Sequence, residues 1–95
     1  MPQFAVEYTY EENSDAVRDE HRPRHREWLR GLYDEGTLLL SGPFADGTGG
    51  LLIFSAADAD RLADLLAVDP FNEVGVVANV RIKAWSPIIG PIAAE

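Results

Sequence analysis

A strand, a helix and a strand follow one another twice along this chain, and this order restricts the fold more than any other feature. Residues 3–10 alternate apolar and polar side chains, as a half-buried strand does. Residues 37–44 (TLLLSGPF) predict a buried strand that ends at the Gly42-Pro43 turn, and residues 51–55 and 76–85 predict two more strands. The order βαββαβ predicts an α+β, ferredoxin-like fold, in which an antiparallel four-stranded sheet carries both helices on one face.

The first helix is expected over residues 23–35. Proline suits the first turn of a helix, which favours a start at Pro23, and Gly36 suits a left-handed cap at the end. The inward-facing stripe of this helix combines His25 with two leucines. Residues 11–20 are polar and are expected to form a loop with a weak helical turn.

The second helix is expected over residues 56–67, with Ser55 as its N-cap and Asp58 three residues later. The segment DPFNEVG predicts a compact turn, in which Asp69 caps the backbone and Pro70 takes the first helical position. The tail, residues 86–95, is apolar but irregular. We expect it to lie over a sheet edge or on a partner subunit.

Composition narrows the class of protein. With 95 residues, 46% of them hydrophobic and 25% charged, the chain is expected to be a single soluble domain over residues 1–95. It has no cysteine, which excludes disulfides, a thiolate nucleophile and cysteine-ligated zinc. The net charge of −8 argues against nucleic acid and anionic membranes as partners. No apolar run is long enough to span a membrane and no signal peptide is evident, so a cytoplasmic protein is expected.

Several short motifs together resemble the YciI-like, or YCII-related domain, family. They are Arg22, Pro23 and His25, then DEGTLLLSGP, and then DPF after the second helix. The resemblance covers nearly the whole chain and implies a ferredoxin-like fold that dimerises as an α+β barrel. It also implies an active-site cleft whose histidine and aspartate correspond to His25 and Asp69.

The same resemblance implies chemistry on small molecules. One branch of the family is associated with dehydrochlorination of a chlorinated hydroxyquinol, and structural relatives include muconolactone isomerases. The loop FADGTGG is shorter here than the insertion that several relatives carry. If that insertion helps to close the cleft, the size of the substrate and its enclosure stay open for this chain.

His25 has two interpretations, a buried structural histidine or a general acid–base. The ring is expected near a helix N-terminus and after several arginines, which both disfavour another positive charge, and burial acts in the same direction. The imidazole is therefore expected to be uncharged near pH 7, as a general base requires. Asp69 either only caps its turn or also orients the imidazole by accepting the second ring N–H. We predict that the two residues form a catalytic pair.

The remaining candidates are polar residues near the expected cleft. Arg22 either anchors an anionic substrate or pairs with a neighbouring carboxylate, and Ser41 either contacts substrate or is an ordinary strand-end hydroxyl. No nucleophile completes a triad with His25. Arg26 and Arg30 are expected on the solvated outer face of the helix, although a rim that attracts anions is the alternative.

A metal site needs consideration because His21 and His25 are four residues apart and could join Asp69 as ligands. Pro23 lies between them and argues against one continuous helix that carries both. No metal and no cofactor are therefore expected.

The leading hypothesis is a small cytoplasmic enzyme that works without a cofactor. It would move a proton on a small cyclic or aromatic-derived acid and catalyse elimination, isomerisation or hydrolysis. The alternative is a non-catalytic dimeric module that binds a small ligand or a protein. In both cases a homodimer through the open sheet face is expected, because that face would otherwise expose apolar strand residues.

Overall fold

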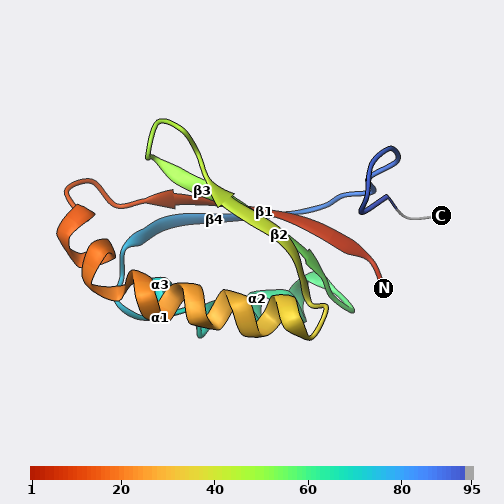
Figure 1. The fold of residues 1–95 in the computed structure, drawn as a ribbon, viewed down its shortest axis with the longest axis horizontal. Coiled ribbons are helices and arrows are strands. Elements are labelled where there is room, and N and C mark those ends of the chain that lie inside the picture. Colours follow the sequence, from red (N-terminus) through yellow and green to blue (C-terminus); the bar gives the residue numbers. More distant parts are fainter. Residues whose placement is uncertain (94–95) are drawn as a thin grey trace.

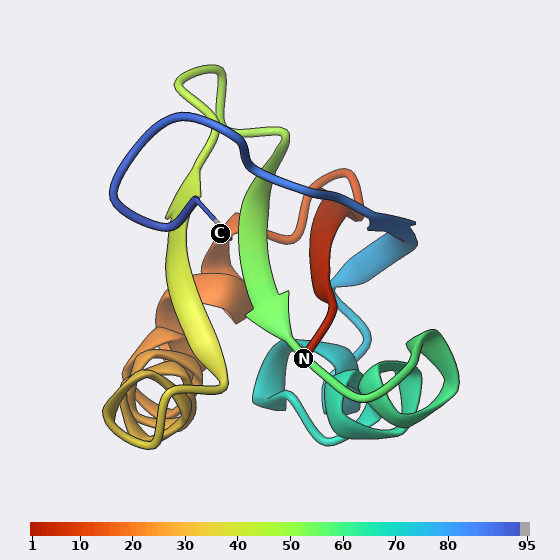
Figure 2. The same cartoon turned by 90° about the vertical axis from the view of Figure 1, so that its right-hand side faces the viewer.

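Four strands form one antiparallel sheet, and the helices cover only one of its faces (Figures 1 and 2). The computed structural model describes residues 1–93. Its elements, in chain order, are β1 (Gln3–Tyr10), α1 (Asp15–Asp34), β2 (Leu38–Pro43), β3 (Gly49–Ser55), α2 (Ala59–Ala67), α3 (Pro70–Glu73) and β4 (Val77–Ala84). The spatial strand order is β2-β3-β1-β4, which confirms the predicted ferredoxin-like α+β fold.

The core lies between the sheet and the helices, and β1 runs through its centre because it pairs with both β3 and β4. Every second side chain of β1, namely Phe4, Val6 and Tyr8, is buried beneath the helices. Apolar side chains from the other elements complete the core: Leu32, Leu38, Leu52, Phe54, Leu62 and Leu66. The alternation in the sequence thus identified the buried face of β1.

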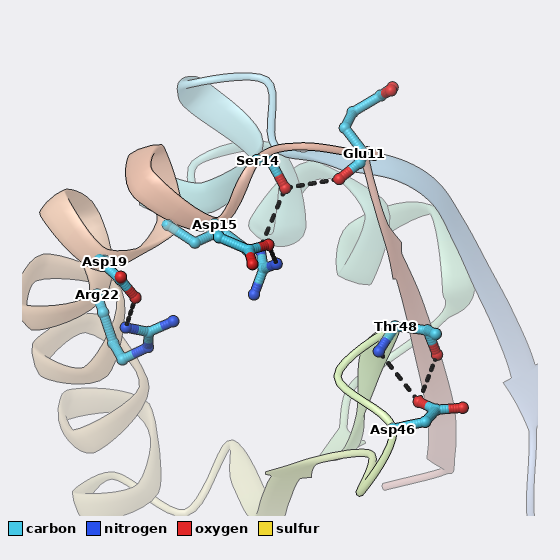
Figure 3. Close-up of polar contacts among 8 residues, drawn as sticks. Glu11, Ser14, Asp15, Asp19, Arg22, Asp46 and Thr48 are labelled. Carbon is cyan, nitrogen blue, oxygen red and sulfur yellow. Dashed lines mark hydrogen bonds and ion pairs between the residues drawn. The ribbon is translucent and has the colours of Figure 1, made fainter.

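The start of α1 differs from the prediction. The helix begins at Asp15, so Pro23 lies inside it and not in its first turn. Ion pairs between residues three apart stabilise the turns before the proline, and one of them joins Arg22 to Asp19 (Figure 3). Pro23 cannot donate a hydrogen bond to the carbonyl of Asp19, and the first turns of α1 run at an angle to the rest (Figure 1). Gly36 has a φ of 85° and ends the helix as predicted.

The second helix also starts later than predicted. The Asp58 carboxylate accepts a hydrogen bond from the Arg61 backbone N–H and is the N-cap of α2, whereas Ser55 is the last residue of β3. After α2, Asp69 caps α3 through the Phe71 N–H, as the sequence predicted. The segment predicted as a turn is therefore a short helix with a capped start.

β2 is not the buried strand that the sequence predicted. It is an edge strand, and Leu38 is its only buried residue. The strand continues through Pro43, which an edge position tolerates. The chain reverses after it, where Asp46 accepts two hydrogen bonds from Thr48 and Gly47 has a φ of 75° (Figure 3). These bonds lower the pKa of the exposed Asp46 carboxyl.

The sheet face away from the helices is mixed in polarity. In the half made by β1 and β4, Glu7 lies opposite Arg81. In the half made by β2 and β3, Leu40 and Leu51 are exposed. The expected apolar face is therefore confined to one half of the sheet.

The C-terminal segment turns back to the start of β1. The backbone N–H of Trp85 donates to the carbonyl of Gln3, and the Gln3 side-chain amide donates to the carbonyl of Ile92. Ile88 and Ile89 on this segment are strongly exposed. Residues 94–95 of the predicted tail lie outside the described residues. Within residues 1–93, no helix has the length and apolar character that crossing a bilayer requires.

Candidate active site

A cleft with a volume of about 900 Å³ lies between α1 and the β2 side of the sheet. Its floor includes Tyr8 of β1, Leu38 of β2 and Leu52 of β3, while α1 forms one wall and β2 the other. His25 and Phe71 also line it. A cleft of this size is typical of sites for small molecules.

The structure brings His25 and Asp69 together although 44 residues separate them. The Nδ1 atom of His25 lies 2.7 Å from Oδ1 of Asp69, and the carboxylate has no exposure to solvent. A carboxylate can only accept, so Nδ1 carries the proton in this hydrogen bond. The neutral ring is therefore held as the tautomer whose Nε2 is an acceptor.

The second ring nitrogen of His25, Nε2, faces a different environment from Nδ1. It has no hydrogen-bond partner within residues 1–93. Among the side-chain N and O atoms of these residues that are fully buried, only Oε1 of Gln3 lacks a partner, so Nε2 is not fully buried. Nε2 therefore keeps contact with solvent, in a residue that lines the cleft. A substrate in the cleft could exchange a proton with this nitrogen.

Asp69 accepts two further hydrogen bonds. The Phe71 backbone N–H donates to Oδ1 over 2.9 Å, and the Tyr8 hydroxyl donates to Oδ2 over 2.8 Å. One carboxylate thus caps α3, orients the imidazole and binds a tyrosine of the central strand. The two alternatives left open by the sequence, capping and orienting, are both realised in the geometry.

Tyr8 is a site residue that sequence analysis missed. Its hydroxyl donates to Asp69 and accepts from the Asn72 side-chain amide, which also donates to the carbonyl of Leu66. Burial raises the pKa of Tyr8 far above its usual value, and the negative charge of Asp69 raises it further. The hydroxyl therefore stays protonated and donating. A signal was present, since a tyrosine on the buried face of a strand needs a partner for its hydroxyl.

Aromatic side chains fix the plane of the imidazole. The rings of His25 and Phe71 are stacked, with centroids 3.8 Å apart and planes 4° from parallel. Tyr10 meets Phe71 edge to face, and the guanidinium of Arg18 lies over the Tyr10 ring. Burial raises the pKa of Tyr10, while Arg18 and Arg22 act in the opposite direction.

One argument for an uncharged His25 was wrong. Because α1 begins at Asp15, His25 lies almost three turns inside the helix and not near its N-terminus. The helix dipole acts mainly within the first turn. The nearest full charge to the ring is the carboxylate of Asp69.

The arginines of α1 agree with expectation only in part. Arg26 and Arg30 are exposed, as expected of a solvated face, but both also line the cleft together with Arg18 and Arg22, which fits the alternative of a rim that attracts anions. The earlier start of α1 does not explain why Arg26 and Arg30 line the cleft, because their positions around the helix relative to His25 do not depend on where the helix begins. The cleft reaches further around the helix than the buried stripe alone indicated.

Arg22 and Ser41 both line the cleft, on opposite walls. Arg22 donates to Asp19, so the local ion pair that the sequence left open is formed. Ser41 is exposed and lies opposite Leu52 in the sheet register. The structure thus places both residues where substrate contact is possible.

His21 and His25 share one helix, so the proline argument against a common helix was wrong. His21 is half-buried, with Nε2 3.8 Å from a carboxylate oxygen of Glu20. In residues 1–93, no group of three or more His, Cys, Asp or Glu side chains is placed to hold a metal ion.

The architecture and the cleft define a class, namely small α+β domains with a ligand-sized cleft between the first helix and the sheet. The model of the YCII-related domain family matches residues 3–86, and the chain belongs to this family. The uncharacterized protein YjpA of Bacillus subtilis (strain 168) is 32% identical over 72 residues, which cover 76% of this chain and 84% of that protein. The resemblance seen in the sequence is confirmed.

Two solved structures have a similar fold. One is 5-chloro-2-hydroxyhydroquinone dehydrochlorinase (TftG) from Burkholderia phenoliruptrix AC1100, in complex with 2,5-dihydroxybenzoquinone. It has a TM-score of 0.80 and 23% identity, and the match covers 90% of this chain and 94% of that one. The other is muconolactone isomerase, with a TM-score of 0.71, 17% identity, and coverage of 98% and 97%. At these identities the likeness shows a shared fold.

Proposed function

We propose that this protein is a small enzyme that needs no cofactor and uses His25 and Asp69 as an acid–base pair. The observation that carries the proposal is the asymmetry of the imidazole of His25, which lines the cleft: Nδ1 faces a buried carboxylate, while Nε2 has no partner in residues 1–93 and keeps contact with solvent. A general base needs an acceptor atom beside the substrate and a group that stabilises the proton once it has arrived. His25 supplies the first and Asp69 the second.

The proposed substrate is a small cyclic or aromatic-derived acid. Nε2 takes a proton from a carbon next to a carbonyl, or from a phenol, and Asp69 stabilises the imidazolium that results. The electron pair left on the substrate then either expels a leaving group or moves the double bond. In an isomerisation the imidazolium returns the proton to a different carbon. In a hydrolysis Nε2 would take the proton from water instead.

Two further residues have proposed roles in binding. Arg22 binds the acid group of the substrate, because a guanidinium offers two parallel donors to a carboxylate. Ser41 contacts the substrate from the opposite wall. The two dissimilar enzymes that share the fold support a small-molecule reaction in this cleft.

The alternative function is a non-catalytic binding module with the same cleft. One observation favours it: every hydrogen bond of Asp69 also serves the fold, because it joins β1, α1 and α3. In such a binding module the His25–Asp69 hydrogen bond stabilises the fold, and His25 exchanges no proton with the ligand.

We also propose that the protein is a homodimer whose partner covers the apolar half of the outer sheet face. Leu40 and Leu51 are exposed there, and the adjoining C-terminal segment adds the exposed Ile88 and Ile89. Exposed apolar side chains that cluster in this way are typical of interfaces.

The test starts with a panel of small phenolic and lactone acids, screened for a shift in thermal stability. Each acid that binds is then incubated in D₂O, and NMR follows deuterium uptake at its acidic carbon. His25→Asn should lower the rate of uptake by about 100-fold or more, because it removes the proton-accepting nitrogen. His21→Asn, on the same helix, should leave the rate unchanged.

Two results would contradict the proposal. Uptake at the wild-type rate in folded His25→Asn would exclude His25 as the base. Acids that bind to the wild-type protein but never exchange or turn over would favour the binding module. Should His25→Asn lose much of its stability, His25→Gln at the same pH would show whether exchange and stability are lost together.

A further inference from the structure

The charges that line the cleft are all of one sign. The chain has eight Lys and Arg residues and sixteen Asp and Glu residues. Four of the eight line the cleft, whereas no Asp or Glu of residues 1–93 does. A protein with a net charge of −8 therefore presents a cationic cleft, which attracts anions despite the repulsion from the molecule as a whole.

The four cationic residues, Arg18, Arg22, Arg26 and Arg30, follow one another at intervals of four along α1. Each interval advances about 6 Å along the helix axis and turns about 40° around it. The series thus runs from Tyr10, whose ring Arg18 covers, toward Tyr33, whose ring lies near Arg30. The positive charge extends along the cleft and is not concentrated at one point.

The members of this series differ in their partners. Arg18 pairs with Asp15 and Arg22 with Asp19, each three residues earlier (Figure 3). Within residues 1–93, no ion pair involves Arg26 or Arg30. Two guanidinium groups at one end of the cleft thus have all their charge available to a ligand.

We propose that Arg26 and Arg30 form a distal subsite for a second anionic group of the substrate. The substrate class is then a small cyclic or aromatic dicarboxylate, with one carboxylate at Arg22 and the other at the distal subsite. Leucine side chains of α1 and of the floor contact the ring between them, and Nε2 of His25 faces that ring. This inference rests on the proposed function in taking the cleft as the substrate site and Arg22 as the residue that binds the first carboxylate.

The spacing fits a dicarboxylate with acid groups on opposite sides of one ring. Arg22 and Arg26 are about 6 Å apart along the helix axis, and Arg30 is about 6 Å further on. Leu29 lies on the same side of α1, and Leu38 and Leu52 form the floor beside it. Bidentate arginine contacts at both ends would orient the ring against the imidazole.

The experiment compares terephthalate with benzoate as probes, by calorimetry at low ionic strength. The two acids share the ring, and only terephthalate has a carboxylate at the opposite end. The wild-type protein should bind terephthalate about tenfold or more tightly than benzoate, because one additional charge-assisted contact is made. The double variant R26Q/R30Q should lose this preference and bind benzoate almost as the wild type does.

R24Q is the matched control. Arg24 is on the same helix but does not line the cleft, and it lies 3.7 Å from Glu73. The variant removes a positive charge from α1 and should keep the preference for terephthalate. R26K/R30K, which conserves the charge but not the paired donors, should keep part of it.

Four outcomes would overturn the subsite. The wild-type protein could bind both acids equally or bind neither, or R26Q/R30Q could lose both by the same factor. A shift in the monomer–dimer equilibrium of R26Q/R30Q, with the preference intact, would assign these arginines to a second copy instead. The proposed function is tested separately, because His25→Asn should keep the preference for terephthalate while it loses deuterium exchange.

Discussion

The Asp69 side chain joins the fold to the proposed chemistry. Its two oxygens accept from His25, from Tyr8 and from the backbone of Phe71, and the residue is fully buried. A change at this position therefore affects three elements at once. Variants of different shape can separate the contribution to folding from the contribution to proton transfer.

Asp69→Asn should fold with a loss of about 1–2 kcal/mol in the free energy of unfolding, because an asparagine oxygen can still cap α3. Asp69→Ala should lose about 3–5 kcal/mol, because it removes the cap of α3 and also leaves the Tyr8 O–H and the His25 Nδ1–H without an acceptor. Urea denaturation of the two variants and the wild type measures the difference. Equal losses in the two variants would show that the polar contacts contribute little to stability.

Tyr8 makes stability depend on alkaline pH. Burial and the Asp69 charge raise its pKa in the folded protein, whereas an unfolded tyrosine loses its proton near pH 10. Above about pH 10 the unfolded state therefore binds fewer protons than the folded state. The free energy of unfolding should fall as the pH rises, by up to about 1.4 kcal/mol per pH unit for this group.

Tyr8→Phe removes that titration. The variant should be less stable near neutral pH, by about 1–3 kcal/mol, because Asp69 loses a donor. Between about pH 9 and pH 11 its stability should fall less steeply than that of the wild type. Tyr10, whose pKa is also raised, titrates in both proteins and cancels in the comparison. Parallel pH profiles would contradict the role assigned to Tyr8.

At the scale of elements, the sequence was sufficient for the type and order of the helices and strands but not for all of their boundaries. Alternation predicted β1, and Gly36 predicted the end of α1. The start of α1 was missed because ion pairs between polar residues stabilise a helix without an apolar stripe. The edge position of β2 depends on strand order, which no local pattern encodes.

The same limit applies to the site. His25 and Asp69 could be selected from their motifs, and the structure brings them together. Tyr8 lies 61 residues from Asp69, and its role depends on the register of β1 against the helices. Arg26 and Arg30 could not be placed, because the extent of the cleft around α1 depends on the position of β2.

Two glycines test how closely the elements pack. A Cβ atom added at Gly49 of β3 would lie 1.8 Å from the carbonyl oxygen of Tyr8, so β1 and β3 would have to separate. Gly49→Ala should therefore destabilise the protein by about 3 kcal/mol or more. Gly31 of α1 has no atom within 4 Å of its added Cβ, and Gly31→Ala should stabilise by about 0.5–1 kcal/mol.

Thermal or urea unfolding of both glycine variants gives the comparison. The Gly31 substitution is the control, since it adds the same methyl group in an open position. If the two variants had similar stability, the close approach of β1 and β3 at Gly49 would be refuted.

At the scale of the whole molecule, helices cover one sheet face (Figure 2), and Leu40 and Leu51 are exposed on the other face. These two leucines lie on neighbouring strands. If a second copy covers them, a charged side chain at either position would be buried without a partner, which is strongly unfavourable.

L40E/L51E should therefore shift the protein from dimer to monomer in sedimentation velocity, while its circular dichroism stays that of the wild type. Tyr33→Glu places a charge at another exposed position, on α1, and should leave the dimer intact. A wild-type protein that sediments as a monomer, or a double variant that remains dimeric, would rule out this interface.

The account depends most on which nitrogen of His25 carries the proton. ¹⁵N NMR of the imidazole, recorded on the free protein at a pH where the ring is neutral, measures this directly. We predict a protonated Nδ1 and an unprotonated Nε2, with this preference lost in Asp69→Asn. A ring that is protonated at Nε2 in the wild-type protein would contradict the account, because the cleft would then face a donor and no base.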